Sequence, residues 1–219
     1  MIEEIFFNNS RKKIEGVYFQ STNINNSAAI IISPHPLYGG TMNNTVIHNI
    51  FYVLVKNNFS VLKFNFRGVG KSMGYFDHGN GELMDAAIAF DWLRNKNPEA
   101  RDYWVIGFSF GAWLALQLLL RRPEINYFIM IAPTTASYDF NFVFPCPASG
   151  IIIQGNRDVI SKQEDSYKLY QKLSRENMNV YYKLIVGADH SFFNCYFLLN
   201  YAIQNFIIDR KNSEADDGN

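Results

Sequence analysis

The pentapeptide Gly107-Phe108-Ser109-Phe110-Gly111 is the part of this sequence that most clearly suggests chemistry. It joins an apolar stretch, 103–108, typical of a buried strand, to residues 110–122, which are typical of a helix. A strand that turns at once into a helix strains the backbone of the central residue, and small neighbours prevent clashes there. Such a turn would project the Ser109 hydroxyl above the sheet edge, beside the positive end of the helix. We therefore predict that Ser109 is a nucleophile.

His190 is the candidate base for this serine. A serine hydroxyl is a weak nucleophile and needs a base within hydrogen-bond reach. Of the four histidines, only His190 follows Ser109 in the chain, which is the order used when the serine lies on a strand–helix turn. It comes just after the expected strand 180–187, so its loop lies at the same sheet edge as Ser109. An ordinary surface histidine is the alternative interpretation.

Asp158 is the candidate acid that orients the histidine. It ends the tetrapeptide 155–158, which directly follows the expected strand 149–155. A carboxylate in this place would fix the tautomer of His190 and stabilise the imidazolium that forms. Asp189 is a rival, but it adjoins His190, and neighbouring side chains of a loop rarely converge. A turn-capping role for Asp158 is the other alternative.

Backbone N–H groups are expected to stabilise the oxyanion of a tetrahedral intermediate. One donor should be the N–H of Phe110, the residue after the nucleophile. The second should come from the loop 33–40, after an earlier strand. Its two prolines lack an N–H, which leaves Leu37 or Tyr38, and Leu37 is preferred. His35 is expected to support this loop.

A group of aromatic residues is expected around the same sheet edge and predicts an apolar pocket. Such a pocket favours short acyl or aromatic groups. The residues expected to line it are Tyr38, Tyr75, Phe76, Phe140 and Phe192, with Tyr138, Phe142 and Phe193 as further candidates.

Short apolar runs alternate with segments of helical period along the chain. Strands are expected at 28–33, 60–66, 103–108, 127–132, 149–155 and 180–187, and helices at 43–56, 82–95, 110–122, 162–177 and 191–210. This order predicts an α/β fold, a mostly parallel doubly wound sheet with helices on both faces and no large lid domain. The stretch 2–20 has no helical period and is expected to form an antiparallel hairpin at one edge. Residues 1–210 are expected to form one domain, followed by a flexible acidic tail, 211–219.

Composition excludes several classes of protein. Charged residues make up 18% of the 219 residues and the formal net charge is zero, unlike the basic surface of a nucleic-acid binder. A small-molecule substrate fits better. The two cysteines and four histidines lack metal-ligand spacing, so neither a metal nor another cofactor is expected. The apolar runs are too short to span a membrane, and a cytoplasmic protein is expected.

Two other functions compete with a serine hydrolase. Residues 68–72, Gly-Val-Gly-Lys-Ser, resemble the end of a phosphate-binding loop, but the leading glycine of that motif would fall at position 65, which is Asn. A structural turn fits this segment better than a nucleotide site. The second alternative is a binding module that keeps the same fold without catalysis.

Taken together, these motifs resemble the α/β-hydrolase superfamily over nearly the whole chain. The segments that carry the resemblance are PHPLYGGTMNN, NFRGVGKSMGYFDHG, GFSFGAW, GNRD and GADHSF. The combination is similar to small bacterial hydrolases related to dienelactone hydrolases and short-chain esterases. The resemblance implies a triad of Ser109, Asp158 and His190 and hydrolysis of an ester-like bond. It does not imply a substrate. Many dienelactone hydrolases use a cysteine nucleophile, whereas this chain has Ser109, so the resemblance does not extend to that exact activity. Peptidases and thioesterases also share this fold.

Overall fold

The computed structural model describes residues 2–9, 12–23, 26–142 and 146–217. Its strands are β1 (Ile2–Asn9), β2 (Lys12–Phe19), β3 (Ala28–Ile32), β4 (Ser60–Phe64), β5 (Tyr103–Phe108), β6 (Ile125–Ile131), β7 (Ser149–Gly155) and β8 (Val180–Ile185). Its helices are η1 (Pro36–Tyr38), a single 3₁₀ turn, and α1 (Thr45–Lys56), α2 (Asn80–Lys96), α3 (Phe110–Leu119), α4 (Gln163–Glu176) and α5 (Tyr196–Asp217).

The described strands form one sheet in the order β1-β2-β4-β3-β5-β6-β7-β8. From β4 to β8 every neighbouring pair is parallel. β1 and β2 form an antiparallel hairpin, and β2 also pairs antiparallel with β4. The mostly parallel sheet and the edge hairpin predicted from sequence are therefore confirmed.

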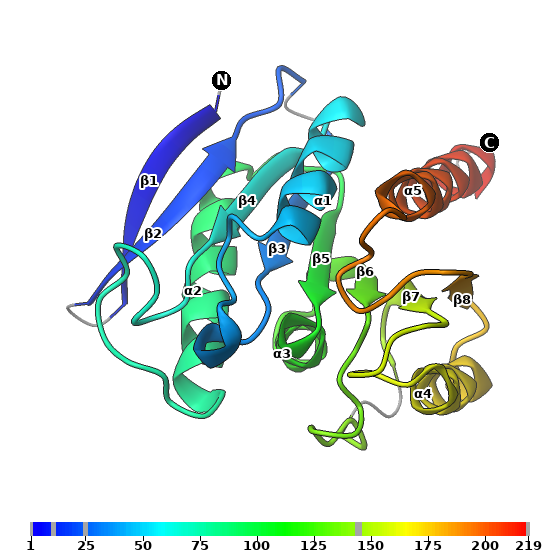
Figure 1. Ribbon diagram of the computed structural model, residues 1–219. Helices are drawn as coiled ribbons and strands as arrows, with labels where there is room; N and C mark the ends of the chain where they lie inside the picture. The colour runs from blue at the N-terminus through cyan, green and yellow to red at the C-terminus, as the bar shows by residue number, and fades with distance from the viewer. Residues whose placement is uncertain (1, 10–11, 24–25, 143–145, 218–219) are drawn as a thin grey trace.

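Helices cover both faces of the sheet (Figure 1). The core on one face includes buried side chains of α1 and α5, and the core on the other includes those of α2, α3 and α4. Every residue of β3 is fully buried, as expected of a central parallel strand covered on both sides. The doubly wound arrangement is confirmed, and no large lid domain occurs among the described residues.

The last helix differs from its prediction at both ends. It begins at Tyr196 instead of residue 191 because the intervening residues form a turn, in which Phe192 and Asn194 have positive φ angles of 56° and 58°. It also continues to Asp217, past the expected end at residue 210. Residues 211–217 contain neither glycine nor proline, so nothing in them interrupts the helix. This part of the expected tail is helical, and residues 218–219 lie outside the described residues.

None of the described helices is long and apolar enough to cross a membrane. The carboxyl ends of the parallel strands β3 to β8 all lie at one edge of the sheet. Loops that follow these strands carry the residues considered next, as is usual for ligand sites in open α/β sheets.

Candidate active site

Ser109 lies in the strained turn between β5 and α3. Its backbone angles are φ 57° and ψ −119°, a combination that residues other than glycine rarely adopt. The Ser109 N–H donates to the carbonyl oxygen of Ile131 at 2.9 Å, and its carbonyl oxygen accepts from Ala112. These bonds tie the turn to β6 and to the first turn of α3, and so hold the hydroxyl in place.

Two glycines allow this turn to fit against the sheet. A Cβ atom on Gly107 would come within 2.3 Å of the Gly111 carbonyl oxygen, and one on Gly111 within 2.3 Å of the Ile32 carbonyl oxygen. Contacts this short do not occur in folded proteins, so larger residues at either position would displace the turn. The spacing of the pentapeptide thus follows from the close packing of α3 on β3 and β5.

The side chains of Ser109, His190 and Asp158 form a continuous hydrogen-bonded chain. The Nε2 atom of His190 lies 2.9 Å from the Ser109 Oγ atom, and its Nδ1 atom lies 2.8 Å from the Asp158 Oδ2 atom. The Asp158 side chain is fully buried and that of His190 is 16% exposed. The structure therefore brings together the three residues that the sequence singles out, in the geometry required for proton transfer.

Asp158 is fixed by three further donors. Its Oδ1 atom accepts from the N–H groups of Ile160 at 2.9 Å and Ser161 at 2.8 Å. Its Oδ2 atom, which faces His190, also accepts from the Gln154 side-chain amide at 3.0 Å. Gln154 is fully buried and was not among the predicted site residues. In the sequence, a glutamine near the end of an apolar strand is the feature that could have indicated this role.

Asp189, the rival acid, faces away from the imidazole Nδ1 atom. Its Oδ1 atom accepts from the Ser191 hydroxyl at 2.9 Å and the Phe193 N–H at 3.0 Å. Partial burial acts to raise the pKa of Asp189, and these hydrogen bonds outweigh it, so that the pKa is lowered. Asp189 therefore stabilises the turn that follows His190.

The segment 33–44, called the cavity loop below, lies beside Ser109. His35 caps the η1 turn, since its Nδ1 atom accepts from the Leu37 N–H at 3.1 Å. The N–H groups of Tyr38, Gly39 and Gly40 donate to backbone carbonyls of the same loop. Leu37 is 66% exposed and does not line the cavity at Ser109. The expected second oxyanion donor is thus engaged by His35, whereas no acceptor for the Phe110 N–H is found among the described residues.

His35 is enclosed by aromatic rings. Its ring centroid lies 4.7 Å from that of Tyr38 and 4.8 Å from those of Phe76 and Phe110. Burial lowers the pKa of His35, which favours the neutral imidazole and leaves Nδ1 able to accept from Leu37. The expectation that His35 supports the loop therefore agrees with its contacts.

A cavity of about 540 Å³ opens at Ser109 and His190. Its walls come from the cavity loop, from residues after β6, and from the loops that carry Asp158 and His190. Neither lysine nor arginine occurs among the described residues that line it, and the exposed Val159 and Ile160 lie at its border. The lining consists of Pro34, His35, Tyr38, Gly39, Gly40, Asn44, Phe108, Ser109, Phe110, Thr134, Ser137, Tyr138, Val159, Ile160, Asp189, His190 and Ser191.

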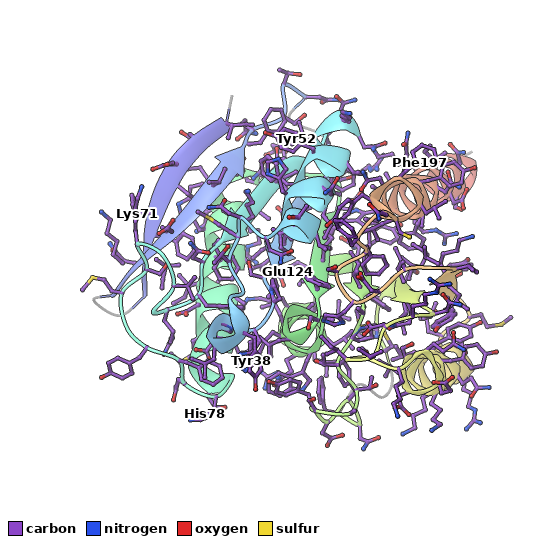
Figure 2. All side chains as sticks on the ribbon, in the orientation of Figure 1. Tyr38, Tyr52, Lys71, His78, Glu124 and Phe197 are labelled. Carbon is purple, nitrogen blue, oxygen red and sulfur yellow. The ribbon has the colours of Figure 1, made fainter. Side chains whose placement is uncertain are left out.

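Most of the aromatic residues predicted for the pocket lie elsewhere. Tyr38, which Figure 2 labels at the η1 turn, is among the residues that line the cavity, as is Tyr138. Tyr75 is 79% exposed away from it, and Phe76 packs behind His35 and Phe110.

Four further aromatic residues also lie outside the cavity. Phe140 and Phe142 stack on each other, and Phe140 borders a separate groove. Phe192 is fully buried in the core beneath α1 and α5, and Phe193 is exposed. Sequence alone does not tell a wall residue from a core residue in such loops, because both positions favour large apolar side chains.

The Gly68–Ser72 segment forms a structural turn, as the preferred interpretation of that motif predicts. The Gly68 N–H donates to the Ser72 carbonyl oxygen, and the Ser72 hydroxyl donates to the Asn65 carbonyl oxygen at 2.8 Å. The described residues contain no group of three or more His, Cys, Asp or Glu side chains that could hold a metal ion.

The chain has an α/β hydrolase fold. Its sheet order, the turn at Ser109 between β5 and α3, and the loops after β7 and β8 that carry Asp158 and His190 all agree with this fold. Known structures agree with this assignment. The candidate α/β hydrolase ATU1826 of Agrobacterium tumefaciens, a protein of unknown function, is 42% identical, with a TM-score of 0.92 over 97% of this chain and 98% of that one. XC6422 of Xanthomonas campestris, an α/β serine hydrolase without a lid, is 28% identical, with a TM-score of 0.85 over 95% and 94% of the two chains.

A family assignment follows from the sequence comparisons. Residues 28–149, more than half of the chain, match the model of the serine aminopeptidase family S33, and the chain belongs to this family of α/β hydrolases. The uncharacterized protein RP471 of Rickettsia prowazekii is 48% identical over 194 residues, which cover 86% of this chain and 82% of the relative. The closer likeness to dienelactone hydrolases stays a prediction.

Proposed function

We propose that this protein is a serine hydrolase that cleaves a carboxylic ester-like bond of a small substrate through an acyl-enzyme intermediate. The observation that carries the proposal is the hydrogen-bonded chain from Ser109 through His190 to Asp158 at the wall of an open cavity. Relatives described as α/β serine hydrolases support it.

The proposed reaction has two balanced halves. The Ser109 oxygen attacks the carbonyl carbon of the ester and gives its proton to the Nε2 atom of His190. The tetrahedral intermediate collapses, the carbon–oxygen bond to the alcohol breaks, and the imidazolium protonates the departing alcohol. Water then attacks the acyl-enzyme with His190 again as base, which releases the carboxylic acid and the Ser109 hydroxyl. Asp158 stabilises the imidazolium in both halves.

The oxyanion of each intermediate is stabilised by N–H groups. The Phe110 N–H, at the first position of α3, is the first donor. We assign the second to the Leu37 N–H, whose acceptor in this structure is the His35 side chain and not a backbone carbonyl. The other N–H groups of the η1 turn bind backbone carbonyls, which makes them harder to release.

The cavity favours uncharged substrates. Most of the surface that its lining exposes is apolar, and it offers no lysine or arginine among the described residues to pair with an anion. An anionic acyl group would lose its hydration without gaining a partner. We expect neutral acyl groups to give higher kcat/KM values than otherwise similar anionic ones.

Peptide hydrolysis is the second candidate, because the matched family is that of serine aminopeptidases. An aminopeptidase needs an anionic partner for the substrate ammonium group. Asp189 is the carboxylate among the described lining residues, and its Oδ1 atom already accepts from Ser191 and Phe193. Thioester cleavage uses the same steps, and a catalytically inactive binding module would need none of them.

A fluorophosphonate probe tests the proposal directly. We expect one probe per chain to attach at Ser109, with none attached to Ser109→Ala. Matched p-nitrophenyl esters, p-nitroanilides and thioesters with the same acyl group then rank the three reactions, and the ester is expected to give the largest kcat/KM. Absence of labelling in the folded wild-type protein would favour the binding module and contradict the hydrolase.

A further inference from the structure

Lys63, near the end of β4, is a buried cation that the proposed chemistry does not use. Lys63 is only 5% exposed, and none of the described residues forms an ion pair with it. Burial of an unpaired charge costs free energy unless other contacts compensate. Those contacts are the Met42 carbonyl oxygen, 3.1 Å from its Nζ atom, and the ring of Phe51, whose centroid lies 5.2 Å away.

Asn65, two residues further on, binds the same residue from the same face of the sheet. Its Oδ1 atom accepts from the Met42 N–H at 2.8 Å, and Asn65 is itself 3% exposed. Lys63 and Asn65 therefore hold both the carbonyl oxygen and the N–H of Met42. We call these two bonds the Met42 clamp.

The backbone of Asn65 is fixed in turn by the neighbouring structure. Its N–H donates to the Glu15 carbonyl oxygen of β2 at 3.0 Å, and its carbonyl oxygen accepts from the Ser72 hydroxyl. The turn at Gly68–Ser72 thus supports the residue that holds Met42. A rigid anchor of this kind is required if a clamp is to position a loop.

Met42 lies in the cavity loop, two residues after Gly40 and two before Asn44, and both of these residues line the cavity. The η1 turn precedes this point and α1 follows it. Displacement of Met42 would therefore move the cavity wall relative to Ser109. Displacements of about 1 Å near reacting atoms can lower rates by roughly a hundredfold.

We propose that Lys63 and Asn65 are positioning residues, which hold the cavity loop through Met42 in the arrangement that the transition state needs. Neither residue lines the cavity, so they act through the loop and not on the substrate. The catalytic part of this proposal rests on the function proposed above, whereas the structural part does not.

Lys211 of α5 offers a matched control. Its Nζ atom donates to the Asn57 carbonyl oxygen at 2.9 Å and lies 5.0 Å from the centroid of the Phe59 ring. It makes the same two kinds of contact as Lys63, but after the C-terminal end of α1 instead of before its N-terminal end. Lys211→Met therefore removes a lysine bond to a backbone carbonyl, at a partly buried position, without touching the cavity loop.

The experiment compares wild type, Lys63→Met, Asn65→Leu and Lys211→Met by hydrogen exchange and by kinetics. We expect the first two variants to exchange the backbone amides of residues 37–44 at least about tenfold faster, and Lys211→Met to leave them unchanged. In Lys63→Met, kcat for a p-nitrophenyl ester should fall roughly ten- to a hundredfold. The affinity for a trifluoromethyl ketone, which forms an oxyanion with Ser109, should fall in parallel, and that for the matching methyl ketone should not.

Several outcomes would overturn the proposal. Wild-type kcat and ketone affinity in Lys63→Met would refute the positioning role, and so would equal losses in Lys63→Met and Lys211→Met. If Lys63→Met does not fold, Asn65→Leu tests the other half of the clamp. In the wild type, rapid exchange of the Met42 N–H contradicts the clamp directly. A wild-type protein that no fluorophosphonate labels would refute the hydrolase function while leaving the exchange measurements able to test the clamp.

Discussion

The two sides of the cavity are held in place by different kinds of contact. On the side of Asp158 and His190, each acid is fixed by bonds within its own loop: Asp158 accepts from the N–H groups two and three residues ahead, and Asp189 accepts from the N–H four residues ahead. On the side of the cavity loop, Met42 is held by the side chains of Lys63 in β4 and of Asn65 just after it, more than twenty residues away. In the proposed mechanism, proton transfer therefore relies on acids fixed within their own loops, and the position of the cavity loop relies on contacts between distant segments.

Of the substitutions considered, removal of the proposed nucleophile should lower the catalytic rate most. Ser109→Ala keeps the turn, since alanine tolerates the same backbone strain as serine. We expect kcat for a p-nitrophenyl acyl ester to fall by about five orders of magnitude, as in other serine hydrolases. A thermal melt within a few degrees of the wild type would show that the fold is intact. Hydrolysis at the wild-type rate would rule out Ser109 as nucleophile.

Asp158→Asn tests the proton-transfer side and should have the next largest effect. The asparagine oxygen can still accept from Ile160 and Ser161, but its amide would then face the imidazole Nδ1 atom as a donor. His190 would turn to the tautomer with its proton on Nε2, which cannot accept from Ser109. We expect kcat to fall by about three to four orders of magnitude.

Asp189→Asn is the matched control for this variant. Asp189 caps the turn after His190 and does not bind the imidazole, so its replacement should change kcat by less than about tenfold. If kcat fell more in Asp189→Asn than in Asp158→Asn, Asp189 and not Asp158 would be the acid that orients His190.

The same difference between local and distant contacts explains what the sequence could predict. Ser109, Asp158 and His190 each lie in the turn or loop that follows a parallel strand, so topology brings them to one sheet edge. Gln154 and Lys63 are polar residues that follow apolar residues in their strands. The sequence around them does not indicate which groups they contact. Phe192 and Phe140 lie in loops at the correct edge, but whether they face the cavity or the core depends on backbone angles that the sequence does not reveal.

Substitution of His35 tests the role of the cavity loop. It should lower kcat less than substitution of Asp158. His35→Leu frees the Leu37 N–H from its acceptor, but the η1 turn also loses the cap that fixes the direction of this N–H. We expect kcat to fall about tenfold with KM little changed, because the loop contributes mainly to the transition state. His35→Asn should restore kcat to within about threefold, since an asparagine side chain accepts readily from the N–H two residues ahead. Equal losses in the two variants would show that the Nδ1 bond does not matter.

The smallest expected effect is the pH dependence of stability that His35 confers. Burial lowers the pKa of His35 below its ordinary value of 6.5 in the folded protein, so between these two values the unfolded chain binds more protons than the folded one. His35 therefore contributes fully to stability above about pH 6.5, and this contribution is lost as the pH falls from 6.5 toward the folded-state pKa. Urea unfolding of wild type and His35→Asn between pH 5 and 8 measures it, because the other three histidines are common to both proteins. The free energy of unfolding of the wild type, relative to the variant, should be constant above pH 7 and decrease below 6.5. An increase at acid pH would mean that the folded protein favours a protonated His35, which could not accept from Leu37.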